Sequence, residues 1–210
     1  MKQKLDIMAT IKDGVAIGFV NFLSIIATVL LYILSLIIPY INVGTTIAVS
    51  ALPAEMAKGK MINPLYIFQS KYRRNMGEFL ILEALKMGAL SVAFLFLFFP
   101  GFVISIAWSF AEILFVDQDK SPMDALCDSN KMTYGNKWRI FWINTLLCLF
   151  IMIAVLIIIG ICAAVDADWL TIVGAILVVL LALFFVPAVL GVQAAIYKKL
   201  SEPEAPEAAE

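Results

Sequence analysis

Residues 99–141 read FPGFVISIAWSFAEILFVDQDKSPMDALCDSNKMTYGNKWRIF and decide the fold. The stretch opens with a Pro-Gly break in apolar sequence and continues as a short apolar helix. A capped amphipathic helix follows from Ser121 to Gly135, and the collar Lys137-Trp138-Arg139 opens the next apolar run. Proline between apolar helices, and basic and aromatic residues at the ends of apolar runs, are typical of membrane proteins. The stretch therefore predicts an α-helical membrane protein.

The composition of the whole chain indicates the same class. Hydrophobic residues make up 63% of the 210 residues and the mean hydropathy is +0.98, whereas soluble domains are about half apolar. The sequence contains no His, and Cys127, Cys148 and Cys162 lack the paired spacing of a disulfide framework or a zinc site. The sequence also lacks motifs for phosphate binding or nucleophilic catalysis. We therefore expect a protein that is not an enzyme, holds no metal or other cofactor, and has no nucleic-acid partner.

Six apolar runs predict an all-α transmembrane bundle. They cover residues 15–38, 43–57, 79–99, 102–116, 140–165 and 169–196. About 20 helical residues cross the ~30 Å hydrocarbon core, so the second and fourth runs are short. We interpret the six runs as three hairpins within a single transmembrane domain, residues 1–200, followed by a disordered acidic tail at residues 201–210.

Pro100 and Gly101 mark the structural break between the third and fourth runs. Proline lacks a backbone donor, so the pair either kinks one long helix or turns a hairpin. We favour the hairpin, because an unbroken helix over residues 79–116 is nearly twice the length that a bilayer needs. The turns at residues 39–43, 100–101 and 166–168 contain no Lys or Arg. Cytoplasmic loops carry the excess of basic residues, which predicts that these turns lie outside and both termini in the cytoplasm.

Two segments carry the signals of interfacial amphipathic helices. Asn63-Pro64 through Gly77 aligns with Ser121-Pro122 through Gly135 at a constant offset of 58 residues. An internal repeat explains the alignment, and so does chance, because Pro at the start and Gly at the end of a helix are common. The second segment is the candidate interfacial or docking helix. Its apolar face would hold Met123, Leu126 and Cys127, and its polar face Asp128 and Lys131; we prefer contact with the bilayer over contact with a protein partner.

Ionisable side chains near the spans are candidate polar or pathway residues. Glu83 and Lys86 lie three residues apart, and Glu112 lies near the end of the fourth run. Charged groups at membrane depth are costly and often functional, but all three residues are within reach of the inner interface, where Lys side chains snorkel. We prefer the interfacial interpretation.

Small residues and amides inside the spans predict helix packing. Gly14 through Gly18 and Gly191 through Ala195 are small-xxx-small patterns that permit close approach of helices. Asn21, Asn144 and Gln193 lie within apolar runs, and we interpret them as hydrogen-bonding groups between helices.

The central stretch resembles a bacterial family of polytopic membrane proteins, catalogued as domain of unknown function nine-seven-five. The resemblance rests on Pro100-Gly101, the aromatic and small-residue run to Phe115, Asp117, Asp119, Ser121-Pro122, Ala125-Leu126, Ser129, Gly135-Asn136-Lys137-Trp138 and Phe141. It covers about a fifth of the chain and implies a multi-pass protein of the bacterial cytoplasmic (inner) membrane. The family has no assigned activity, so the resemblance carries no site residues over.

Two functions fit these observations. The first is a non-enzymatic integral membrane protein that acts by self-association, partner docking or local membrane shaping, because short spans and interfacial helices perturb a bilayer. Its partners would be membrane lipids and either a second copy of the chain or another membrane protein. The second is a small-solute or ion transporter or pore, because broken helices and Glu112 could line a path.

Overall fold

The computed structural model describes residues 4–96, 98–165 and 168–201, and this part of the chain is helical without strands. The predicted all-α fold is thus confirmed, while residues 202–210 of the predicted acidic tail lie outside the described residues. The helices, in chain order, are α1 (Ile7–Val20), α2 (Phe22–Ser35), α3 (Pro39–Ser50), α4 (Leu52–Ala57), the 3₁₀ helix η1 (Pro64–Phe68), α5 (Lys71–Arg74), α6 (Met76–Phe96), α7 (Phe98–Ala107), α8 (Ala111–Asp117), α9 (Pro122–Thr133), α10 (Lys137–Val165) and α11 (Asp168–Ser201).

Four stretches of the described chain are long and apolar enough to cross a membrane. They are Met76–Phe96, Phe98–Asp117, Lys137–Val165 and Trp169–Ser201. The pair α1 and α2 makes a fifth if its 72° bend is accepted within one span. Length and composition thus confirm a membrane protein with four or five candidate spans, where the sequence predicted six.

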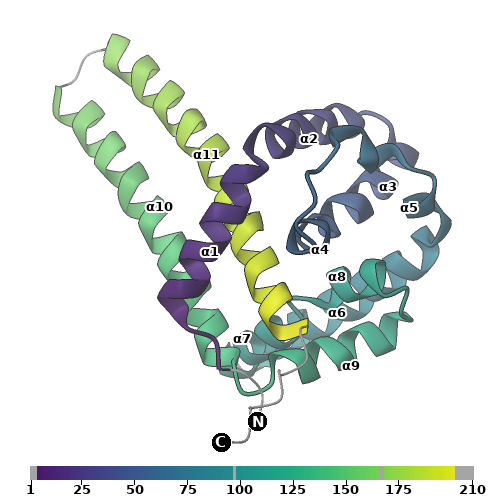
Figure 1. Cartoon of the computed structure of the whole chain (residues 1–210). Helices are drawn as coiled ribbons and strands as arrows, with labels where there is room; N and C mark the ends of the chain where they lie inside the picture. Colours follow the sequence, from purple (N-terminus) through teal and green to yellow (C-terminus); the bar gives the residue numbers. More distant parts are fainter. Residues whose placement is uncertain (1–3, 97, 166–167, 202–210) are drawn as a thin grey trace, which may run out of the picture.

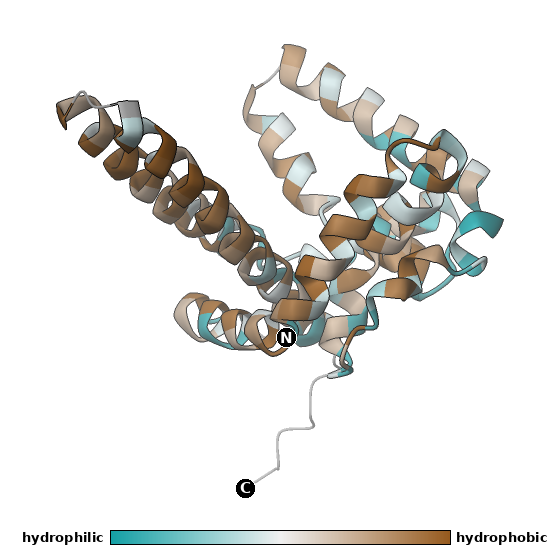
Figure 2. Ribbon diagram, turned by 90° about the horizontal axis from the view of Figure 1, so that it is seen from above, coloured by the Kyte–Doolittle hydropathy of each residue, from teal (hydrophilic) through white to brown (hydrophobic). Residues whose placement is uncertain are grey.

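The helices α10 and α11 lie side by side and project away from the rest of the molecule (Figure 1). Only 6% of the most apolar window of α10 is buried within the protein, and only 17% of that of α11. Hydropathy colouring shows both helices as almost continuously hydrophobic (Figure 2). Exposing this much contiguous apolar surface to water is unfavourable, so the pair is suited to a lipid environment.

The predicted first span, residues 15–38, is not one straight helix. It breaks at Asn21, whose side chain is 4% exposed. Asn21 Nδ2 donates to the Ile17 carbonyl at 3.3 Å, and Asn21 Oδ1 accepts from the backbone N–H of Ile62 at 3.2 Å. The amide therefore joins the bend to a distant loop.

The predicted second span, residues 43–57, is also divided. It covers the later part of α3 and all of α4, with Ala51 between the two helices. The helix α3 has 12 residues in total, and α4 has 6. Pro53 lies in the first turn of α4, the one place in a helix where its missing donor is harmless. Neither helix reaches the length of a span.

The two segments predicted to be similar share their start and differ afterwards. The side chains of Asn63 and Ser121 both cap a helix, accepting from the backbone N–H of Leu65 and of Asp124. Residues 63–77, however, form η1, α5 and the first turn of α6, whereas α9 is one continuous helix. Gly77 lies inside α6 and does not end a helix; Gly135 follows α9 with a φ of +84°.

The two small-residue patterns pack against each other and join α1 to α11. A Cβ atom on Gly191 would lie 2.1 Å from the carbonyl oxygen of Gly14, and one on Gly18 would lie 2.1 Å from that of Pro187. The backbones are therefore closer than any side chain allows. Lys199 adds an ion pair to Asp13 at 2.7 Å on the same helix pair.

Candidate functional site

The chain reverses direction after α6, so that α7 and α8 run back along it. The ring of Phe94 lies 5.4 Å from that of Phe102, and the ring of Phe79 lies 5.9 Å from that of Phe115. Gly101 lies in the first turn of α7, where a Cβ atom would meet the Phe94 ring at 2.6 Å. Pro100 shares that turn, so the two residues predicted to break the helix lie inside α7. Residue 97, between α6 and α7, lies outside the described residues.

The helix α9 runs antiparallel to α7 and α8 and packs along them. Ser129 Oγ donates to the Ala107 carbonyl at 2.7 Å and accepts from the Phe110 N–H at 3.2 Å. Ser129 therefore links the end of α7 to the start of α8. Farther along, Tyr134 and Gly135 line a groove together with residues of α7.

The buried face of α9 is not the predicted apolar face. Of Met123, Leu126 and Cys127, only Leu126 is buried, with 4% of its surface exposed, while Met123 is 58% exposed and Cys127 is exposed. The face that packs against the protein contains Ala125, Leu126, Ser129, Met132 and Thr133. Ser129 and Thr133 can lie on this buried face because their hydroxyls donate to backbone carbonyls.

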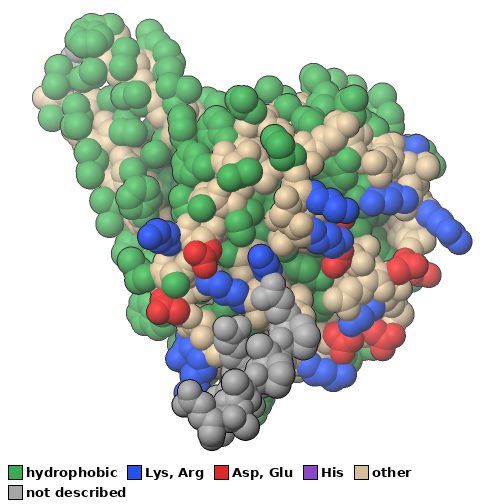
Figure 3. Space-filling model, viewed as in Figure 1, with side chains coloured by type: hydrophobic (Ala, Val, Ile, Leu, Met, Phe, Trp, Pro, Cys, Tyr) green, Lys and Arg blue, Asp and Glu red, His purple; other side chains and the backbone are tan. Residues whose placement is uncertain are grey.

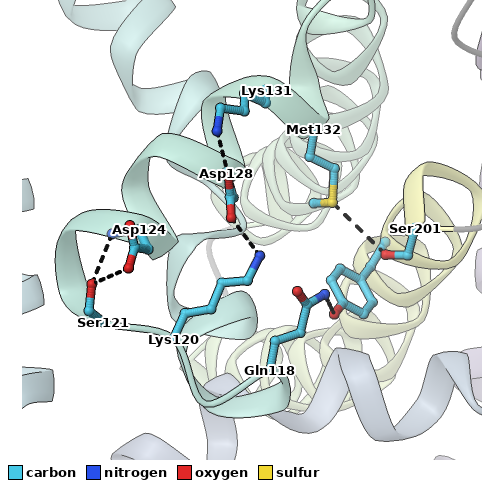
Figure 4. Close-up of polar contacts among 9 residues, drawn as sticks. Gln118, Lys120, Ser121, Asp124, Asp128, Lys131, Met132 and Ser201 are labelled. Carbon is cyan, nitrogen blue, oxygen red and sulfur yellow. Dashed lines mark hydrogen bonds and ion pairs between the residues drawn. The ribbon is translucent and has the colours of Figure 1, made fainter.

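The predicted polar face of α9 carries a charge cluster. Asp128 lies between Lys120 and Lys131, at 2.6 Å and 3.0 Å from their ammonium groups (Figure 4). The hydrogen bond from Lys120, with that from Lys131, holds the pKa of Asp128 below its ordinary value. Asp124 pairs with the hydroxyl of Ser121 at the helix start. The outward face of α9 therefore suits water or lipid headgroups and not the hydrocarbon core.

Glu83, Lys86 and Glu112 are brought together between α6 and α8. The ammonium group of Lys86 contacts Glu83 at 2.9 Å and also pairs with Glu112. The Lys86 side chain is 16% exposed, and the two glutamates are about a third exposed. The three residues form a compact ion cluster in an otherwise apolar hairpin.

A second polar cluster, which the sequence did not reveal, joins α4, α8 and α11. Asp117 pairs with Lys58 and accepts from the Tyr197 hydroxyl at 2.7 Å. Burial lowers the pKa of Lys58, but the hydrogen bonds with Asp117 and Glu55 outweigh it, and the net direction is upward. Charged side chains gather over the lower part of the face in Figure 3, while hydrophobic side chains cover the projecting hairpin.

The start of α7 lies beside the start of α10. The Phe99 ring is 6.2 Å from the Trp138 ring, and the Phe102 ring is 6.5 Å from that of Phe141. The six-span arrangement predicts Pro100-Gly101 and Lys137-Trp138 on opposite faces of a hydrocarbon core about 30 Å thick. These contacts do not fit that separation.

No family model, no curated protein and no solved structure matches the chain. The resemblance carried by residues 100–141 therefore stays a prediction.

Proposed function

We propose that the chain is a non-enzymatic integral membrane protein that shapes the bilayer locally. In this proposal α10 and α11 cross the membrane as a hairpin, and α6 to α9 form a wedge in the cytoplasmic leaflet. The observation that carries it is the antiparallel packing of α9 along α7 and α8, fixed by Ser129. Helices that insert in one leaflet only enlarge that leaflet and favour curvature.

The depth of the wedge follows from the charges on α9. Asp124 and Lys131 are exposed and Asp128 is half-buried, and such charged residues are expensive in the hydrocarbon core. A helix that keeps these side chains hydrated lies at the membrane surface. The helices α7 and α8 run alongside it, so they too lie near the surface. The hairpin of α6 and α7 also exposes large apolar residues, among them Leu85, Leu95, Phe96 and Phe99, and in this proposal they face the acyl chains.

Labelling with an impermeant thiol reagent separates this arrangement from the six-span topology. Single-Cys variants Phe99→Cys and Trp169→Cys are made in a background without native cysteines. We expect external labelling at position 169, at the tip of the crossing hairpin, and none at position 99. Labelling of position 99 from outside supports the six-span topology and contradicts the wedge. A third variant, which keeps Cys127 as its only cysteine, is expected to react only after the membrane is permeabilised.

Vesicle reconstitution tests the shaping activity itself. We expect the protein to convert large vesicles into smaller or tubular ones as its density rises. Phe99→Ser, which weakens the apolar side of the wedge, should reduce the effect. Phe150→Ser, a change of an exposed Phe on α10, is the matched control and should keep it. Unchanged vesicle size at high protein density contradicts the proposal.

The ion cluster of Glu83, Lys86 and Glu112 favours a transporter or pore as the second candidate. Its position between α6 and α8 could serve a proton or cation that moves across the apolar hairpin. A flux of protons or monovalent cations into protein-containing vesicles, lost in Glu112→Gln, would support it. Self-association and docking of a membrane-protein partner remain predictions compatible with either function.

A further inference from the structure

An aromatic groove lies at the corner between α7, α9 and α10. It has a volume of about 460 Å³ and is lined by Phe99, Phe102, Val103, Ile106, Tyr134, Gly135, Lys137, Trp138 and Phe141. This is the size of ordinary ligand pockets, which combine apolar walls with a few polar groups. Among its lining residues, Lys137 is the charged one.

We propose that this groove binds one anionic phospholipid, with an acyl chain along the aromatic wall and the headgroup phosphate at Lys137. The proposal rests on the membrane insertion argued above and adds a specific lipid site to it.

The charge at the rim supports an anionic headgroup. Lys137 Nζ donates to Asn130 Oδ1 at 2.8 Å, which is a neutral amide and leaves the positive charge uncompensated by that contact. Lys137 therefore brings a positive charge to the wall of an apolar groove. Phosphate oxygens are acceptors that its ammonium group can use.

The shape of the site fits a lipid better than it fits a soluble ligand. Trp138 is 62% exposed and Tyr134 is 71% exposed, and such amphipathic rings prefer the headgroup level of a bilayer. Phe102 lies beside Phe141, one turn farther into α10 than Lys137, and offers the apolar wall that an acyl chain requires. The headgroup end and the acyl end of the groove thus follow the order of groups in a phospholipid.

Quenching of Trp138 by brominated lipids tests the proposal. A full-length variant keeps Trp138 and has its other three tryptophans replaced by Phe. It is placed in phosphatidylcholine vesicles that contain either brominated phosphatidylglycerol or brominated phosphatidylcholine. We expect half-maximal quenching at an about fivefold lower fraction of the anionic lipid, since that is the gain from one lysine near an anionic surface. Lys137→Gln should remove the difference, whereas Lys60→Gln, an exposed lysine elsewhere, should keep it.

Val103→Phe, which fills the groove, should weaken quenching by both lipids. Equal quenching by both lipids in the unmodified groove, an equal effect of Lys60→Gln, or unchanged quenching in Val103→Phe overturns the proposal. Quenching that falls as the protein density rises also overturns it, because a second copy would then occupy the groove. Vesicle shape is not the readout here, so a negative result leaves the shaping experiment to decide the proposed function by itself.

Discussion

Ser129 Oγ donates a hydrogen bond to the carbonyl oxygen of Ala107 at 2.7 Å, and this contact joins α9 to the break between α7 and α8. The same oxygen accepts from the Phe110 N–H, and Ser129 is fully buried. Ser129→Ala therefore removes the partner of two backbone groups in one change. A buried group left without its partner costs about 1–3 kcal/mol.

We expect Ser129→Ala to lower the thermal unfolding midpoint in detergent and to expose the chain between α7 and α8 to protease. Ser105→Ala is the matched control, because Ser105 Oγ donates only to the Phe102 carbonyl of its own helix in the described contacts. Equal midpoints for the two variants would show that Ser129 does not stabilise the wedge.

Gly191→Ala tests the close contact of α1 and α11. The new Cβ would lie 2.1 Å from the Gly14 carbonyl oxygen and 2.5 Å from the Gly18 nitrogen, so the helices must separate. Overpacking of this kind costs about 1–3 kcal/mol. Gly160→Ala is the control, since a Cβ there meets nothing within 4 Å. We expect a lower unfolding midpoint for Gly191→Ala and an unchanged or slightly higher one for Gly160→Ala.

The ion cluster predicts unequal effects for its members. Lys86→Met leaves Glu83 and Glu112 as neighbouring carboxylates without their cation, and the loss of charged hydrogen bonds costs about 2 kcal/mol. Glu112→Gln keeps the 2.9 Å contact between Lys86 and Glu83, so we expect a loss below about 1 kcal/mol. Unfolding midpoints in detergent measure both. A larger loss for Glu112→Gln than for Lys86→Met would contradict the contacts described here.

The sequence predicted best what depends on length and composition. The runs at residues 140–165 and 169–196 are helical in α10 and α11, because apolar stretches of that length have few other stable forms in lipid. The small-residue patterns at residues 14–18 and 191–195 also predicted close packing correctly. The pattern alone could not tell that each would be the partner of the other.

Contacts between distant residues could not be predicted from local patterns. Asn21 looked like a group that bonds a neighbouring helix, yet its partner is a loop N–H 41 residues away. Tyr197 and Asp117 are 80 residues apart and neither has a neighbour that signals the other. The buried face of α9 was not predicted, because Ser129 and Thr133 are polar and hydropathy patterns assign polar residues to the exposed face. Their hydroxyls are nevertheless hydrogen-bonded inside the fold.

Acid should weaken the charge cluster on α9. The pKa of Asp128 is below its ordinary value of 3.8 in the folded protein. A carboxyl group with a depressed folded pKa stabilises the protein above its unfolded pKa, and this stabilisation is lost as the pH falls through the folded pKa. We expect the carbon resonance of the Asp128 carboxyl group to titrate below pH 3.8 in the intact protein. Lys120→Met should move that midpoint upward, while a midpoint already at the ordinary value would contradict the pairing.

Asn21→Leu should release the bend between α1 and α2. The change removes the acceptor of the buried Ile62 N–H, which then has to find water or stay unpaired. It also places a good helix former at the break, so α1 and α2 can join into a straighter helix, as predicted from the apolar run at residues 15–38. Both effects detach the loop before η1 from the bend.

The measurement for Asn21→Leu is cleavage at Lys58 and Lys60 by a lysine-specific protease added to detergent-solubilised protein. We expect faster cleavage than in the unmodified chain, at a temperature well below global unfolding. Asn144→Leu is the matched control, because Asn144 is exposed on α10 and the same change there only adds apolar surface that faces lipid. Cleavage at the same rate in both variants would mean that the hydrogen bond between Asn21 and Ile62 does not hold the loop, and that the bend has another cause.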